Sequence, residues 1–271
     1  MVKPRIIETN EGIQNAFTVE VYDEMMRGLR DRGWIETNLI LKTGITSGLA
    51  LEIGPGPGYL GLEWLKKTEG TNLWAIEISP NMIKKAEENA MEYGLQSRVK
   101  YVEGDARKMP FDGDTFDGVF TNGSLHEWSE PGRIFNEIYR CLKTNGKYLI
   151  SDMRRDMNPF MKWFLKMMTK PKEIRQGLRS SINASYTVQE IQSILLKTEL
   201  KSSKVKKTSL GLIITGKKTA AKQQPDTLRK LISAYTRVAE ESSPILAACV
   251  FWGCYDMVGR YHKCLGVALC A

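Results

Sequence analysis

The sequence predicts an α/β protein with a doubly wound, seven-stranded, mostly parallel sheet. Two observations lead to this class. Short apolar runs alternate with stretches of helical periodicity between residues 49 and 152, as expected for a parallel sheet covered by helices on both faces. In addition, glycines at positions 54, 56 and 58 connect the first apolar run to a helix, an arrangement that exposes backbone N–H groups to a ligand.

The first part of the chain, residues 1–44, is predicted to form an N-terminal helical cap. Residues 11–43 carry apolar side chains near a helical repeat, and Gly33 and Gly44 interrupt this pattern. The first ten residues are polar and lack the apolar segment of a secretory signal. We therefore expect a cytoplasmic protein.

Strands and helices are then expected to alternate. The predicted strands are residues 49–53, 73–78, 99–102, 116–121 and 146–152, and the predicted helices are residues 58–67, 80–93 and 131–143. Ser79 has the side chain of an N-cap residue, and Pro80 suits the first position of the helix that follows.

The alternation stops after residue 152. Residues 154–172 are basic and apolar, and they carry methionines and three bulky aromatics, Phe160, Trp163 and Phe164, at spacings that usually indicate adaptable core packing. Thr187 begins a capping-box pattern, which predicts a helix. This helix should extend to about residue 197, and two strands at 203–209 and 211–217 should form a final antiparallel hairpin.

Residues 219–271 are predicted to be a helical C-terminal extension. Four of the five cysteines lie here, at positions 249, 254, 264 and 270, near His262. No C-x-x-C pair occurs, so we expect no metal site and favour small buried side chains over a soft-metal site or an intersubunit disulfide. The extension could also join two copies of the chain.

Charge is distributed unevenly along the 271 residues. The net charge is +8, and residues 201–271 hold 12 Lys and Arg against 4 Asp and Glu, so the entire excess lies in this part. A solvated basic surface is the favoured explanation and anion binding the alternative. No uncharged apolar run reaches the roughly 18 residues that a membrane span requires.

The glycine-rich segment allows two kinds of ligand. Gly56, Gly58 and Gly61 match a G-x-G-x-x-G pattern, with Glu77 at about the distance of the acid that binds ribose in dinucleotide sites. However, the first glycine of a dinucleotide site directly follows the strand and faces a pyrophosphate, whereas Glu52 places an acid at the mouth of this loop. An acid at that position favours a ligand with positive charge.

Four motifs in order resemble those of class I S-adenosylmethionine-dependent methyltransferases. The matching segments are residues 52–58 (EIGPGPG), 73–79 (LWAIEIS), 102–106 (VEGDA) and 116–128 (FDGVFTNGSLHEW), followed by residues 142–152 (LKTNGKYLISD). The SLHEW wording is similar to the ubiquinone/menaquinone-type branch, whose members methylate small molecules on carbon, oxygen or nitrogen. The resemblance covers roughly residues 45–218.

This resemblance implies a Rossmann-like methyltransferase domain at residues 45–218 with S-adenosyl-L-methionine as the cofactor. Glu77 would accept the ribose hydroxyls, Asp105 the adenine amino group, and Ala106 would offer a backbone N–H. Ile78 and Met82 would flank the adenine, although they could equally be core residues. The segment after the fifth strand would roof the acceptor pocket. The expected cofactor-binding residues are Glu52, Gly54, Gly56, Gly58, Glu77, Ile78, Met82, Gly104, Asp105, Ala106 and Asn122.

Methyl transfer from a sulfonium is an in-line displacement, so positioning supplies much of the catalysis. The remaining task is to remove a proton from the acceptor. His126 is the best candidate base, because its ordinary pKa lies near neutrality and it follows the fourth strand. Glu127, Tyr22 and Asp152 are weaker alternatives, and a purely structural His126 remains possible.

The expected activity is methyl transfer to a small-molecule acceptor. The chain lacks the Asn/Asp-Pro-Pro-aromatic motif of enzymes that methylate base amino groups, which disfavours nucleic acid as the substrate. Two alternatives stay open. One is an RNA or protein methyltransferase that uses the basic C-terminal region, and the other is a non-catalytic S-adenosylmethionine-binding partner subunit.

Overall fold

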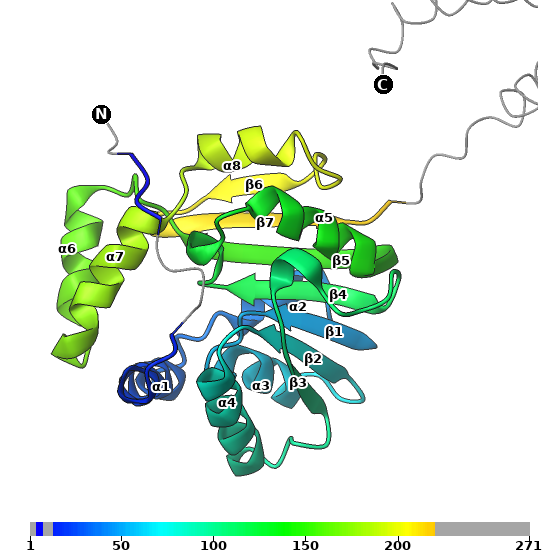
Figure 1. Cartoon of the computed structure of the whole chain (residues 1–271), viewed down its shortest axis with the longest axis horizontal. Helices are drawn as coiled ribbons and strands as arrows, with labels where there is room; N and C mark the ends of the chain where they lie inside the picture. Colours follow the sequence, from blue (N-terminus) through cyan, green and yellow to red (C-terminus); the bar gives the residue numbers. More distant parts are fainter. Residues whose placement is uncertain (1–3, 8–12, 220–271) are drawn as a thin grey trace, which may run out of the picture. The chain divides into compact units, whose positions relative to one another are not determined.

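The computed structural model describes residues 4–7 and 13–219 (Figure 1). Seven strands form one sheet in the order β3-β2-β1-β4-β5-β7-β6. The strands are β1 Leu49–Ile53, β2 Asn72–Glu77, β3 Val99–Glu103, β4 Phe116–Asn122, β5 Leu142–Met153, β6 Lys204–Lys207 and β7 Gly211–Lys217. Strands β1 to β5 pair in parallel, and β7 pairs antiparallel with both β5 and β6. The predicted fold class is confirmed.

The helices of the described residues flank this sheet (Figure 1). They are α1 Ala16–Asp31, α2 Thr37–Thr43, α3 Tyr59–Lys66, α4 Pro80–Glu92, α5 Pro131–Cys141, α6 Pro159–Met168, α7 Arg175–Ala184 and α8 Val188–Leu195, with 3-10 turns η1 Ala106–Lys108, η2 Leu125–Glu127 and η3 Lys172–Ile174. Both predicted N-caps are confirmed. The Ser79 side chain accepts the N–H of Met82, and Thr187 forms a complete capping box with Glu190.

Successive residues of the central strands enter two different hydrophobic cores. Leu51 and Val119 belong to the larger core, which also contains residues of α5 and α8. Their neighbours Ala50 and Phe120 belong to the smaller core, which contains residues of α2 and α3. Because side chains alternate across a strand, these two cores lie on opposite faces of the sheet. The doubly wound arrangement is thus built into the strand sequences.

The boundary between α5 and β5 differs from prediction. The helix expected to continue to residue 143 ends at Cys141, and β5 begins at Leu142 instead of residue 146. Leu142 is fully buried and pairs with Phe116 of β4, ahead of a register shift in that pairing. Burial of this one apolar side chain extends the strand into a segment whose composition favoured a helix end.

The segment after β5 departs further from expectation. Core packing was expected for the aromatics and methionines of residues 154–172, yet Phe160, Trp163 and Phe164 are exposed. Of the methionines in this segment, only Met157 is buried. The expectation of core packing is therefore wrong for α6, and helix α7 was not predicted at all.

The calls on residues 219–271 fall almost entirely outside the described residues. This applies to the helical extension, its cysteines and its proposed role in joining two copies. Within residues 4–7 and 13–219, no helix is both long and apolar enough to traverse a bilayer.

Candidate functional site

The predicted site residues follow the carboxyl ends of parallel strands. Strand β1 lies in the middle of the sheet and pairs with β2 on one side and β4 on the other. The chain order reverses there, and open α/β sheets bind ligands outside the carboxyl ends of strands at such a reversal. The carboxyl ends of β1 and β4 contact each other at this point: the Thr121 hydroxyl donates to the carbonyl of Ile53 at 2.6 Å.

The glycine loop requires its glycines for two reasons. Gly54, Gly56 and Gly58 have φ angles of +62°, +54° and +85°, which other residues rarely adopt. Space is also short, since a Cβ on Gly54 would lie 2.8 Å from Cβ of Ser124, and one on Gly58 would lie 2.7 Å from the Tyr101 hydroxyl. The loop is therefore bare backbone held tightly between neighbouring elements.

Glu52 is a buried acid beneath this loop. Its side chain lies against Gly61 of α3, where a Cβ would overlap the carboxylate. Burial, together with the nearby Glu77 carboxylate, raises the pKa of Glu52 to about 8, while the Gly61 backbone amide opposes this shift. Among the described residues, its Oε2 atom has no hydrogen-bond partner. Such an atom fits a nearby positive charge.

Glu77 ends β2 with its carboxylate turned towards the loop. Oε2 accepts the N–H of Gly56 at 3.1 Å, and Oε1 accepts the N–H groups of Ile78 at 2.9 Å and Ser79 at 3.1 Å. Burial raises the pKa of Glu77, and these three backbone bonds counteract the rise. The expected ribose acid is thus fixed to the glycine loop itself.

The residues expected around adenine follow β2 and β3. Ile78 is half-buried and Met82 is buried, so both alternatives for them remain. Gly104 lies against Ile76, whose Cδ1 would be 3.2 Å from a Cβ at this position. Asp105 caps the η1 turn that begins at Ala106, and its hydrogen bonds with Arg107 hold the pKa of its carboxyl below the usual range.

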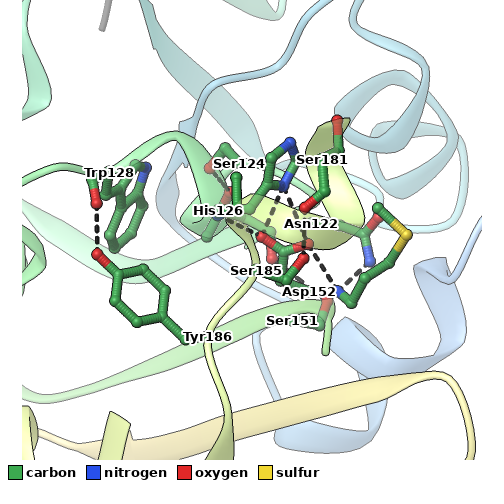
Figure 2. A network of polar contacts seen from close by, with 12 residues as sticks. Asn122, Ser124, His126, Trp128, Ser151, Asp152, Ser181, Ser185 and Tyr186 are labelled. Carbon is green, nitrogen blue, oxygen red and sulfur yellow. Dashed lines mark hydrogen bonds and ion pairs between the residues drawn. The ribbon is translucent and has the colours of Figure 1, made fainter. Parts of the chain in front are cut away.

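His126 lies in η2 directly after β4 and is buried (Figure 2). Its Nδ1 lies 3.0 Å from Oδ2 of Asp152, at the end of β5, and its backbone N–H donates to the same oxygen at 2.6 Å. The other Asp152 oxygen accepts the N–H of Met153. Two backbone donors and one imidazole therefore fix Asp152, which makes it an orienting partner for His126.

The remaining predicted residues have different surroundings. The Asn122 amide donates to Ser151 Oγ at 2.8 Å, as Figure 2 shows, and to the Glu36 carboxylate at 3.2 Å.

Tyr22 of α1 lies against Gly56, because a Cβ built on this glycine would be 3.5 Å from the Tyr22 ring. Burial, and then the carboxylates of Glu127, Asp152 and Glu77, raise the pKa of Tyr22. A phenol in such surroundings is a poor base near neutral pH.

Sequence reasoning missed a polar network that attaches α1 to the glycine loop. Asp23 of α1 accepts from the Tyr59 hydroxyl at 2.9 Å and from the Asn89 amide at 2.8 Å. The same Asn89 amide also donates to the carbonyl of Pro57 in the loop. All three side chains are buried, and helical periodicity alone gave no indication that these polar residues would meet.

It also missed a second anchor, on the segment that carries His126. The Arg5 guanidinium donates to the carbonyls of His126 at 2.7 Å and Trp128 at 3.2 Å, and it stacks over the Tyr186 ring. The Tyr186 hydroxyl donates to the Trp128 carbonyl at 2.6 Å (Figure 2). Arg5 lies far from these residues in sequence, so no local pattern could reveal it.

Comparison with known proteins identifies this arrangement. The family model described as "Methyltransferase domain" matches residues 51–150, which include the glycine loop, Glu77, Asp105 and His126. Residues 51–150 are therefore a methyltransferase domain. The matched residues include the glycine loop, a buried acid with an unsatisfied oxygen and a carboxylate at the end of β2.

Two curated relatives are named for quinone substrates. The chain is 33% identical over 96 residues to 2-methyl-6-phytyl-1,4-hydroquinone methyltransferase 1 of Oryza sativa subsp. japonica. The aligned residues cover 35% of this chain and 28% of the rice protein. It is 27% identical over 165 residues to 2-phytyl-1,4-naphtoquinone methyltransferase of Nostoc punctiforme, covering 59% of this chain and 71% of that protein. The chain thus spans less than a third of the length of the rice protein.

A solved structure shares the fold. A proposed S-adenosyl-L-methionine-dependent methyltransferase from Methanococcus maripaludis aligns with a TM-score of 0.64 and 24% identity, covering 81% of this chain and 100% of that chain. Within the described residues of the methyltransferase domain and its flanks, no group of three His, Cys, Asp or Glu side chains is arranged to hold a metal ion.

Proposed function

We propose that this protein transfers a methyl group from S-adenosylmethionine to a small-molecule acceptor, with His126 receiving the acceptor's proton. The observation that carries the proposal is the pairing of His126 with Asp152 beside a glycine loop bounded by Glu52 and Glu77. When bound, S-adenosylmethionine supplies a methyl group on a sulfonium sulfur, which is already activated for displacement.

In this proposal Glu77 holds the ribose hydroxyls, and the absence of a Cβ at Gly54, Gly56 and Gly58 lets the cofactor approach the loop backbone closely. The N–H groups of these glycines are bonded within the protein, to Ile76, Glu77 and Pro55. Glu52 lies beneath the loop, and its buried carboxylate favours a cationic ligand over a pyrophosphate. Tyr22 covers the loop from the side of α1. These contacts orient the ligand and exclude water from it.

Proton removal is assigned to one atom. With Nδ1 of His126 against the Asp152 carboxylate, the neutral imidazole carries its proton on Nδ1, and Nε2 is the basic nitrogen. The acceptor atom forms its bond to the methyl carbon as the carbon–sulfur bond breaks, and the acceptor's proton passes to Nε2. Asp152 then stabilises the imidazolium that results.

The named relatives make a hydroquinone the first acceptor to test. The full chain is incubated with methyl-labelled S-adenosylmethionine and a set of small hydroquinones, naphthoquinols and unrelated phenols, and the products are identified by mass. We expect one added methyl on an acceptor and an equal amount of S-adenosylhomocysteine. Binding of NADH without any binding of S-adenosylmethionine would refute the assignment.

A further inference from the structure

Helix α6 exposes the apolar side chains that a soluble helix would normally bury. None of its residues, Pro159–Met168, is buried. The apolar face of α6, as we call it, consists of Phe160, Trp163, Phe164, Met167 and Met168, and these side chains are between 41% and 63% exposed. Grouped exposed apolar side chains of this size mark an interaction site more often than a bare surface.

The face has a definite geometry on the helix. At 3.6 residues per turn, its five side chains fall within an arc of about 140°. Met161 and Leu165 follow this arc at its Met168 edge, and both are half-buried, so this edge of the helix is turned towards the rest of the protein. Phe160 and Trp163 contact each other with ring centroids 5.7 Å apart. The largest apolar side chains therefore point away from the domain.

The helix is held in place at both ends, so this exposure belongs to a formed element. The Asn158 side chain accepts the N–H of Met161 at 2.8 Å and caps the start of α6. The Arg175 guanidinium donates to the carbonyl of Thr169 at 3.1 Å and thereby anchors the end of α6 to α7. Figure 1 shows α6 as the outermost helix on its side of the described structure, next to α7.

Positive charge surrounds the apolar face. Residues 159–184 contain the cations Lys162, Lys166, Lys170, Lys172, Arg175 and Arg179, against one acid, Glu173. Lys166, Lys170 and Lys172 are exposed. Aromatic and methionine side chains flanked by lysine are typical of helices that lie in the interface of an anionic bilayer. Each cation near such a surface adds to the attraction.

We propose that the apolar face of α6 docks on an anionic lipid bilayer, with its aromatic side chains in the interface and the flanking lysines at the lipid headgroups. Helix α6 packs on α7, and α7 packs on η2, which carries His126. A bilayer docked on α6 would therefore lie close to the elements that hold the candidate base. A lipid-soluble acceptor would then reach His126 from the bilayer. This consequence rests on the proposed function, whereas the docking of α6 does not.

The test is sedimentation of the full chain, without cofactor or acceptor, with vesicles of phosphatidylcholine alone or of phosphatidylcholine mixed with phosphatidylglycerol. We expect binding to the mixed vesicles, weakening as salt rises because the attraction is partly electrostatic. The replacement pair Trp163→Ser with Met167→Ser should weaken binding about tenfold or more, since two large apolar side chains leave the interface.

A matched control replaces the same residue types, one tryptophan and one methionine, outside α6. Trp34 and Met91 are 50% and 65% exposed, compared with 56% for Trp163 and 52% for Met167. Trp34→Ser with Met91→Ser should therefore leave vesicle binding unchanged. For the charges, Lys166→Gln with Lys170→Gln should weaken binding to the mixed vesicles, whereas Lys42→Gln with Lys84→Gln should not.

Three outcomes would overturn the proposal. The first is no sedimentation with mixed vesicles, and the second is equal loss of binding in the α6 variant and its control. The third outcome concerns the variant Trp163→Ser with Met167→Ser. If this variant binds vesicles as before but changes from a dimer to a monomer, the face is a contact between copies of the chain. Because cofactor binding is measured separately, failure here leaves the proposed methyl transfer intact.

Discussion

One carboxylate oxygen of Asp152, at the end of β5, contacts His126 twice, at 2.6 Å from the backbone N–H and at 3.0 Å from Nδ1. The first contact fixes the backbone that follows β4, and the second fixes the imidazole ring. Backbone and ring are therefore positioned by one acid from the neighbouring strand. This relationship leads directly to two predictions on catalysis.

His126→Gln should lower kcat by about 10² to 10⁴-fold, the range typical of a general base. Affinity for S-adenosylhomocysteine should stay unchanged, because the proposed role of His126 concerns the acceptor alone. Labelled methyl transfer at saturating acceptor gives kcat, and calorimetry gives the affinity. An unaltered kcat would show that His126 has only a structural role.

Asp152→Asn should lower kcat by less than His126→Gln does, because it acts through the histidine. The double variant should then be no slower than His126→Gln alone, since residues that act as a unit are not additive. Comparison of kcat for the two single variants and the double variant checks this. Independent, multiplicative losses would separate Asp152 from the action of His126.

Glu77→Gln should weaken binding of S-adenosylmethionine by about 1.5–3 kcal/mol, the usual contribution of a hydrogen bond to a charged group. Glu103→Gln is the matched control, since Glu103 is an exposed acid at the end of the adjacent strand β3. Calorimetry on both variants measures the difference. Equal affinities for the two would remove Glu77 from the cofactor site.

Gly58→Ala should destabilise the protein by about 1–3 kcal/mol, because the residue has a φ of +85° and its new Cβ would lie 2.7 Å from the Tyr101 hydroxyl. Tyr101→Phe should relieve part of this loss, since it removes the close oxygen but not the backbone strain. Gly177→Ala, in α7 with open space around it, should not destabilise. Urea unfolding of the four proteins provides the comparison.

The buried Glu52 predicts a pH dependence of stability. Burial is the main cause that raises the pKa of Glu52 to about 8, and the nearby Glu77 carboxylate is the second, whereas a Glu in the unfolded chain has a pKa of about 4.3. Between these values the folded state holds a proton that the unfolded state has lost, so the free energy of unfolding should fall as pH rises. Glu52→Gln should flatten this part of the profile for cofactor-free protein. An identical slope in both proteins would contradict the assignment.

The central strands and the glycine loop were predictable because their information is local. Apolar runs of five or six residues, such as Leu49–Ile53, and an N-cap such as Ser79 identify their elements without any distant contact. The end of α5 was not predictable, because burial of Leu142 against Phe116 decides it. Long-range packing moved a boundary that local composition placed elsewhere.

The candidate site was predictable only in part, for a similar reason. Glu52 and Glu77 lie at the carboxyl ends of β1 and β2, so both could be named from the sequence. Asp23 and Arg5 act through partners many residues away, such as Asn89 and the His126 carbonyl. The orientation of α6 was missed because an exposed and a buried amphipathic helix have the same periodicity.

Among the described residues, β6 is the last strand in the sheet order and forms an edge of the sheet, and Lys204, Lys206 and Lys207 are exposed along it. If two copies approached each other along this edge, the lysine side chains of both β6 strands would come close together. Their ammonium groups would repel each other before backbone hydrogen bonds could form. The hairpin therefore ends the sheet chemically as well as topologically. Part of the basic excess of the C-terminal region thus protects the folded chain from strand-to-strand aggregation.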